Sequence, residues 1–305
     1  MLVKSRVYVN QRDNNDENKG KYILENISKN IFMLSALISV ISLLLIIGFV
    51  FYKGLTPFLF KGYSFIDFIT GLEWVPSADS FGILPMVAAS IIATIGALLI
   101  GVPVGILTAI FIAEVAPKKI AKIISPAVEL LAGIPSVLYG IFGLSVIVPS
   151  IQNIFNLPKG QSLLAVIVVL AIMMLPTIIT VSETAIRAVP KSYKEGSLAL
   201  GASKIETIFK VMLPAAKSGI LAAVVLGIGR ALGETMAVIL VAGNSPVIPS
   251  SLMDSVRPLT TNIALEMGYA FGTHQEMLFA TGAVLFVFIL ILNIVLNKLS
   301  NKVVD

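Results

Sequence analysis

Long apolar runs separated by short polar stretches dominate the chain from residue 30 onward. A helix needs about 20 mostly apolar residues to cross roughly 30 Å of hydrocarbon. Six runs with few or no charges reach that length. They cover residues 30–52, 83–113, 123–150, 160–182, 217–243 and 277–297. The pattern therefore predicts an all-α integral membrane protein with six transmembrane helices.

Composition supports this prediction. Apolar residues make up 57% of the chain and charged residues 13%, and the mean hydropathy is +0.96. Soluble domains carry about 45–50% apolar and about 25% charged residues, so soluble enzymes and nucleic-acid-binding proteins are excluded. The absence of cysteine excludes disulfides and metal–thiolate sites.

The first 29 residues differ from the rest because they are polar and mix both signs of charge. Such a stretch cannot bury enough apolar surface to offset its ordering entropy, so we expect a mobile tail. The first apolar run starts too late and lasts too long for a cleaved signal, and it is interpreted as a retained anchor. The predicted domains are thus the tail 1–29 and a transmembrane domain 30–300.

The distribution of lysine and arginine predicts the orientation. With six spans, seventeen of these residues lie on the side of the termini, four lie on the other side, and Arg230 lies within a span. Because basic residues are enriched in cytoplasmic segments, both termini are expected in the cytoplasm.

Two longer loops, 53–82 and 244–275, are then expected outside the cell. Trp74 and Tyr63 are interpreted as residues of the outer membrane interface, and the single histidine, His274, as solvated. These loops are too short to form a binding domain, so capture of a scarce solute would require a separate protein.

Residues 183–217 form a cytoplasmic segment that is longer than a reconnecting turn needs. Pro190 can begin a helix, Gly201 can end it, and apolar residues recur at helical spacing from Ile205 to Met212. The segment therefore predicts a helix–break–helix element beneath the membrane.

This segment resembles the EAA loop of bacterial ABC importer permeases, in which E-A-A is followed after three residues by glycine and after nine more by I-x-L-P. The spacing agrees throughout, although small residues replace both alanines and Val211 replaces the isoleucine. The resemblance implies that the loop docks on an ATPase subunit. Its matching residues are Glu195, Gly196, Ser197, Gly201, Leu213 and Pro214.

Downstream, the run GRALGETMAVILVAGN at 229–244 and the run PAVELLAGIPSVLYGIFG at 126–143 resemble the PstC-type permease of the phosphate importer. The resemblance covers roughly residues 80–300. It implies the type I ABC importer permease fold and a role as half of the pathway for inorganic phosphate. It also implies four kinds of partner: a PstA-type permease, two PstB-type ATPases, a PstS-type external binding protein and membrane lipid. The implied location is a prokaryotic cell membrane.

The chain has no Walker motif, because no glycine precedes any of its Lys-Ser pairs. We therefore expect a non-catalytic subunit that binds no cofactor, with ATP and magnesium held by the partner ATPases.

Three charges fall within predicted spans: Glu129, Arg230 and Glu234. An unpaired charge at the bilayer centre costs about 2.5–3.5 kcal/mol on insertion scales and is usually functional. Arg230 and Glu234 are four residues apart, which on one helix permits mutual neutralisation. Both interpretations stay open at this point: a structural pair, or residues that line the anion pathway. Glu129 is open in the same way.

Two alternatives remain from the sequence. One is a permease for another oxyanion, such as molybdate or sulfate, because nothing in the chemistry of Arg230 separates these anions. The other is an ion-driven secondary transporter, for which the inverted repeats typical of that class are not found.

Overall fold

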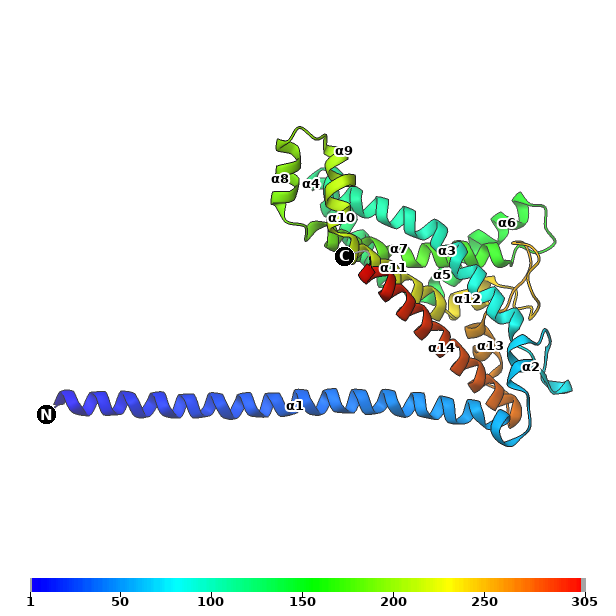
Figure 1. The fold of residues 1–305 in the computed structure, drawn as a ribbon, viewed down its shortest axis with the longest axis horizontal. Helices are drawn as coiled ribbons and strands as arrows, with labels where there is room; N and C mark the ends of the chain where they lie inside the picture. Colours follow the sequence, from blue (N-terminus) through cyan, green and yellow to red (C-terminus); the bar gives the residue numbers. More distant parts are fainter. Residues whose placement is uncertain (1, 303–305) are drawn as a thin grey trace. The chain divides into compact units, whose positions relative to one another are not determined.

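The computed structural model describes residues 2–302, with side chains for residues 21, 22, 24–295 and 298 (Figure 1). Contacts divide the chain into two units, residues 1–52 and residues 53–305. The helices and strands, in chain order, are α1 (Leu2–Phe60), α2 (Phe65–Thr70), β1 (Trp74–Val75), η1 (Pro76–Ala78), β2 (Ser80–Phe81), α3 (Leu84–Ile110), η2 (Phe111–Val115), α4 (Lys118–Ala132), α5 (Ser136–Phe142), η3 (Gly143–Ile147), α6 (Val148–Ile154), α7 (Leu163–Arg187), α8 (Lys191–Ala199), α9 (Lys204–Thr207), η4 (Ile208–Met212), α10 (Leu213–Ala215), α11 (Lys217–Gly233), α12 (Met236–Val241), α13 (Leu259–Glu266) and α14 (Thr273–Lys302).

The first unit is the greater part of α1. The α1 segment Leu24–Phe60 is apolar enough to span a membrane and contains the predicted span 30–52. The backbone of residues 2–29, the predicted tail, is helical as the beginning of α1. The mobility of this tail stays a prediction.

The second unit is a helix bundle centred on α7. This helix packs against both α3 and α11, and most of its residues are buried. Glycines of α3 allow the close approach: a Cβ on Gly101 would lie 2.7 Å from Met174 Sδ, and one on Gly105 would lie 2.6 Å from Ile178 Cγ2. Small residues serve this purpose between membrane helices, where van der Waals packing replaces the hydrophobic effect.

Among the described residues, five helices are long and apolar enough to cross a membrane, and a sixth candidate is the helix pair Lys204–Ala215 and Lys217–Gly233, bent by 71°. The predicted all-α membrane fold is confirmed, and the only strands in the described part of the chain are the two-residue β1 and β2.

The predicted third span, 123–150, is wrong at its beginning. Residues 118–132 form the separate helix α4, and the span itself runs over Ser136–Ile154. Pro135 is the residue before α5 and has no backbone N–H to continue the hydrogen-bond ladder, so the chain breaks after Gly133. Tyr139 Oη donates to Leu131 O (2.7 Å) across this break. The predicted single span is therefore interrupted completely at this point.

The predicted fifth span, 217–243, is also interrupted. Helix α11 ends at Gly233, Glu234 is extended (φ −71°, ψ 130°), and α12 begins at Met236. Two of the predicted spans in the second unit are therefore broken, one before α5 and one before α12, and α5 and α12 pack against each other.

The long helices of the second unit have two differently built ends (Figure 1). At the α8 end lie α8 and α9, beside the last turns of α3 and α7. At the α13 end lie α2, the β1–β2 hairpin and α13, which share a core of buried residues that includes Trp74, Ile83 and Leu259.

Candidate functional site

The segment 183–217 has the predicted helix–break–helix form. Helix α8 follows Pro190. Gly201 lies in the left-handed region (φ +86°), which only glycine adopts without strain. Ser203 then starts α9 with a capping box, because its Oγ accepts from the N–H of Glu206 while the Glu206 carboxylate accepts from the N–H of Ser203. This structural prediction is confirmed.

The capping box fixes the charge state of Glu206. The backbone N–H of Ser203 and the side chain of Lys210 lower the pKa of this carboxyl to about 2. Glu206 thus remains ionised throughout the neutral range. The stability that it adds to the loop is present above its ordinary pKa and is lost only as the pH falls towards 2.

The turn between α8 and α9 is the exposed tip of the α8 end. Glu195, Gly196 and Gly201 are exposed, while Ser197 is half-buried and its Oγ lies 3.0 Å from Thr207 Oγ1. Leu213 and Pro214, farther along, are half-buried and exposed respectively. Three large apolar side chains also face outward here: Leu198, Leu200 (91% exposed) and Ile205 (70% exposed).

An ion pair connects α8 to the transmembrane helices. Lys194 Nζ lies 2.5 Å from Glu114 Oε2 in η2, and the Glu114 side chain is only 9% exposed. Next to it, Arg187 at the end of α7 donates to Ile112 O (3.1 Å) and pairs with Glu183 (2.9 Å). The Lys194–Glu114 pair thus connects α8 to η2, which continues α3, and Arg187 connects η2 to the end of α7.

Arg230 lies in the last turn of α11, half-buried beside the break before α12. Its Nη1 donates to Thr177 Oγ1 on α7 (3.3 Å). The structure therefore places Arg230 against α7, close to the helix break before α12. Because broken membrane helices expose backbone polar groups, they are tolerated only where protein or a wet cavity surrounds them.

Glu234 does not form an ion pair with Arg230, so the structure disfavours the structural pair, one of the two interpretations that the sequence left open. Among residues 21–295, no ion pair within 4.0 Å joins the two. Glu234 is outside helix α11, and its Oε1 instead accepts from the N–H of Ala237 (3.0 Å), at the start of α12. A carboxylate is favourable there because the first N–H groups of a helix have no partner within the helix.

Glu129 is not part of this arrangement. It lies on α4, which packs on α7 and η2, and its side chain is exposed. The structure thus brings Arg230 and Glu234 to one helix break and leaves Glu129 apart from them.

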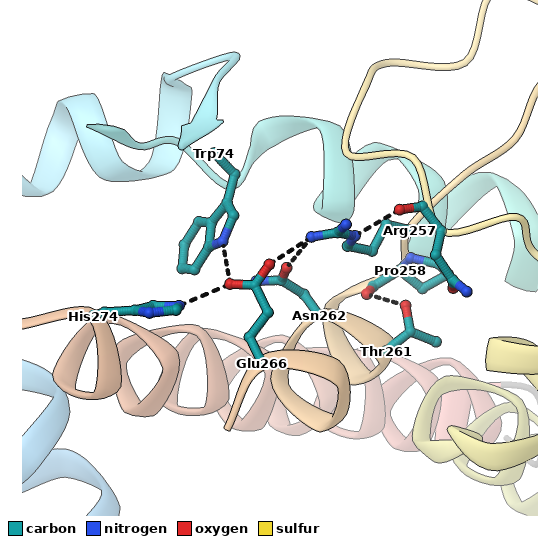
Figure 2. Close-up of polar contacts among 8 residues, drawn as sticks. Trp74, Arg257, Pro258, Thr261, Asn262, Glu266 and His274 are labelled. Carbon is teal, nitrogen blue, oxygen red and sulfur yellow. Dashed lines mark hydrogen bonds and ion pairs between the residues drawn. The ribbon is translucent and has the colours of Figure 1, made fainter. Parts of the chain in front are cut away.

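A buried polar cluster at the α13 end was missed by the sequence analysis (Figure 2). Glu266, the last residue of α13, is 7% exposed. Its Oε2 accepts from Trp74 Nε1 and His274 Nε2, both at 2.7 Å, and its Oε1 accepts from Arg257 Nη1, also at 2.7 Å. We call these four residues the Glu266 cluster.

The cluster changes how two residues are interpreted. Trp74 is buried, with 4% of its surface exposed, and the His274 side chain is 15% exposed rather than solvated. The position of Trp74 at the outer membrane interface stays a prediction. The three residues that contact Glu266 come from β1, the loop before α13 and the start of α14. No spacing in the sequence therefore indicates that these residues meet. The sequence offers one weak signal for this cluster: Arg257 and Glu266 are charged residues in a chain that has few of them.

Several solved structures share this fold. A permease chain of a bacterial alginate ABC transporter covers 92% of this chain and 98% of its own length, with a TM-score of 0.62 and 20% identity. A chain of the MetNI methionine ABC transporter in an inward-facing conformation covers 73% and 95%, with a TM-score of 0.56 and 21% identity. At these identities the likeness shows the fold alone, which is that of the membrane permeases of type I ABC importers.

The chain belongs to the family of binding-protein-dependent transport system inner membrane components, whose model matches residues 101–305. A probable ABC transporter permease, YqgH of Bacillus subtilis, is 44% identical over 271 residues and covers 88% of each chain. The phosphate transport system permease PstC of Haemophilus influenzae is 36% identical over 308 residues, covering 94% of this chain and 93% of its own. PstC of Mesorhizobium japonicum is 37% identical over 241 residues, covering 72% and 74%.

The chain is thus a multi-pass permease subunit of an ABC importer, a transport component rather than a catalyst. Membership implies a partner permease, a separate ATPase and a substrate-binding protein. It also favours an ABC importer over the secondary transporter that the sequence left as an alternative.

Proposed function

We propose that this chain is the PstC-type permease of an importer of inorganic phosphate. The observation that carries the proposal is the likeness to PstC proteins, which at 36% identity extends over 94% of the chain. The partners would be a PstA-type permease, two PstB-type ATPases holding ATP and magnesium, and a PstS-type external binding protein.

The α8 end would dock on the ATPase. Glu195, Gly196, Ser197 and Gly201 form or flank its exposed tip, which fits the cleft-binding role of the resembled loop. The Lys194–Glu114 ion pair supports this role, because it gives a movement of the tip a direct route to α3. Leu213 and Pro214 would hold the base of the loop against the bundle.

Arg230 would contact the anion in the translocation pathway. A guanidinium offers a planar fork of donors that matches phosphate oxygens. Because Glu234 is engaged with the start of α12, Arg230 is not neutralised by that carboxylate. Glu129, which is exposed on α4, would act at the mouth of the pathway.

Both termini and the α8 end would lie in the cytoplasm of a prokaryotic cell, and the α13 end would face outward. The excess of seventeen over four lysines and arginines supports this orientation.

The test is uptake of radiolabelled phosphate at micromolar concentration, with and without this chain, while sulfate and molybdate uptake are followed in parallel. Loss of phosphate uptake alone is the expected result. Loss of sulfate or molybdate uptake instead would retain the permease and replace its substrate with the other oxyanion.

A further inference from the structure

Helix α12 is held at both of its ends by residues of α13 or of the loop before it. At the break before α12, Thr260 Oγ1 of α13 donates to Glu234 O (2.9 Å). Just beyond its other end, Arg257 Nε donates to Asn244 O (2.8 Å). Arg257 in turn pairs with Glu266, the last residue of α13 (Figure 2). Helix α12 has only six residues, and hydrogen bonds from outside the helix hold it in place at both ends.

The position of α12 determines that of the other half-helix, α5. The two are in backbone contact, since a Cβ on Gly140 would lie 2.8 Å from Ala237 Cα. Helix α5 begins at the first break, and Tyr139 on this helix donates to Leu131 O across that break. A shift of α12 would therefore also move α5, because two backbones in direct contact cannot move independently in a close-packed interior.

Helix α13 is itself anchored to the long helices. At its first residue, the N–H of Leu259 donates to Ser90 Oγ on α3 (3.0 Å), and both groups are buried. At its last residue, the Glu266 cluster connects it to β1 and to α14. The Glu266 carboxylate and the Arg257 guanidinium compensate each other in a nearly water-free position, which makes the connection strong and directional.

We propose that Thr260 and Glu266 are positioning residues for transport: through α13 they hold the α11–α12 break, and with it Arg230, in the geometry that couples movement of the anion to ATP hydrolysis. This inference rests on the proposed importer function. It assigns a role to residues that need not touch the anion, at the end of the bundle opposite to the ATPase loop.

The experiment uses the complete importer in proteoliposomes with its binding protein. Hydrogen–deuterium exchange is measured over residues 235–242, and imported [32P]phosphate is counted per ATP hydrolysed. Thr260→Val removes the hydroxyl at constant size, and Thr260→Ser retains it. We expect Thr260→Val to speed exchange over residues 235–242 about three- to tenfold and to raise the ATP consumed per phosphate, while Thr260→Ser behaves as the parent protein. Glu266→Gln should produce the same two changes more strongly.

Exchange over residues 165–175 of α7 serves as the internal control and should not change. Unaltered exchange over 235–242 in Thr260→Val would overturn the inference, even if Glu266→Gln fails to assemble. Faster exchange with an unaltered ratio of ATP to anion would also overturn it, because α13 would then be only structural. If the parent importer takes up sulfate or molybdate instead, the proposed substrate fails, and the same ratio measured with that anion decides the inference.

Discussion

Arg230 has five N–H donors, and one of them, on Nη1, donates to a described residue, Thr177 at 3.3 Å. No carboxylate among the described side chains lies within 4.0 Å of it. An unpaired charge within a span is unfavourable, which agrees with the proposal that Arg230 contacts an anion during transport. Arg230 is unpaired because Glu234 lies outside the helix that carries Arg230.

The first prediction is that Arg230→Gln lowers phosphate uptake without preventing assembly of the importer. Hydrogen bonds to a charged group contribute about 1.5–3 kcal/mol, so a loss of about 10- to 150-fold is expected. The measurement is initial uptake per assembled complex, with assembly followed by co-purification of the ATPase.

Thr177→Val is the matched control, because it removes only the neutral donor–acceptor partner of Arg230. Its effect should be about two- to tenfold, as for an ordinary hydrogen bond. Failure of Arg230→Gln to assemble would instead favour a structural role for the arginine.

At the scale of elements, the turn between α8 and α9 depends on one backbone conformation. Gly201 has φ +86°, whereas Gly196, five residues earlier, lies within α8 with no atom near the position of a Cβ. The two positions therefore have different requirements. Position 201 needs glycine, and position 196 does not.

The second prediction uses this difference. Proline at position 201 cannot adopt a positive φ, so Gly201→Pro should abolish transport by distorting the tip, while the protein still reaches the membrane. Gly196→Ala should retain transport, since alanine favours a helix interior over glycine by about 0.5–1 kcal/mol. Uptake and membrane content are measured for both variants. Normal uptake by Gly201→Pro would contradict the ATPase-docking role of the loop.

At the scale of the whole molecule, the two ends of the bundle differ in chemistry. The α8 end presents basic residues and an exposed apolar tip, whereas the α13 end contains the buried Glu266 cluster and a small hairpin. Such a difference is expected when the two ends meet different partners on opposite sides of a membrane.

The third prediction concerns orientation and uses the absence of native cysteine. Ser192 in α8 and Lys159 before α7 are both exposed. In intact cells whose outer layers are permeable to the reagent, a membrane-impermeant maleimide should label Lys159→Cys. It should label Ser192→Cys only after the cell membrane is opened. The reverse pattern would refute the orientation inferred from the charges.

The breaks and the Glu266 cluster show where prediction from sequence stops. Glycine and proline, as at Gly133 and Pro135, disturb a helix, but nothing local required that α4 leave the span altogether. Arg230 and Glu234 have helical spacing, yet Glu234 leaves the helix because its backbone oxygen accepts from Thr260 and its carboxylate accepts from Ala237. A prediction from helical periodicity holds only while the helix continues. Here the helix ends at Gly233, and one of the hydrogen bonds at this end comes from Thr260, a residue far along the chain.

The sequence by itself determined the membrane class, the approximate spans, the helix–break–helix loop and the family, because apolar run length, turn residues and motif spacing are local properties of a chain. Only the tertiary structure decided that Trp74, Arg257 and His274 meet at Glu266, and that Lys194 meets Glu114. These partners come from segments far apart in the chain, and only packing of the helices brings them within hydrogen-bonding distance. A buried carboxylate needs such donors, but its own sequence neighbours do not supply them.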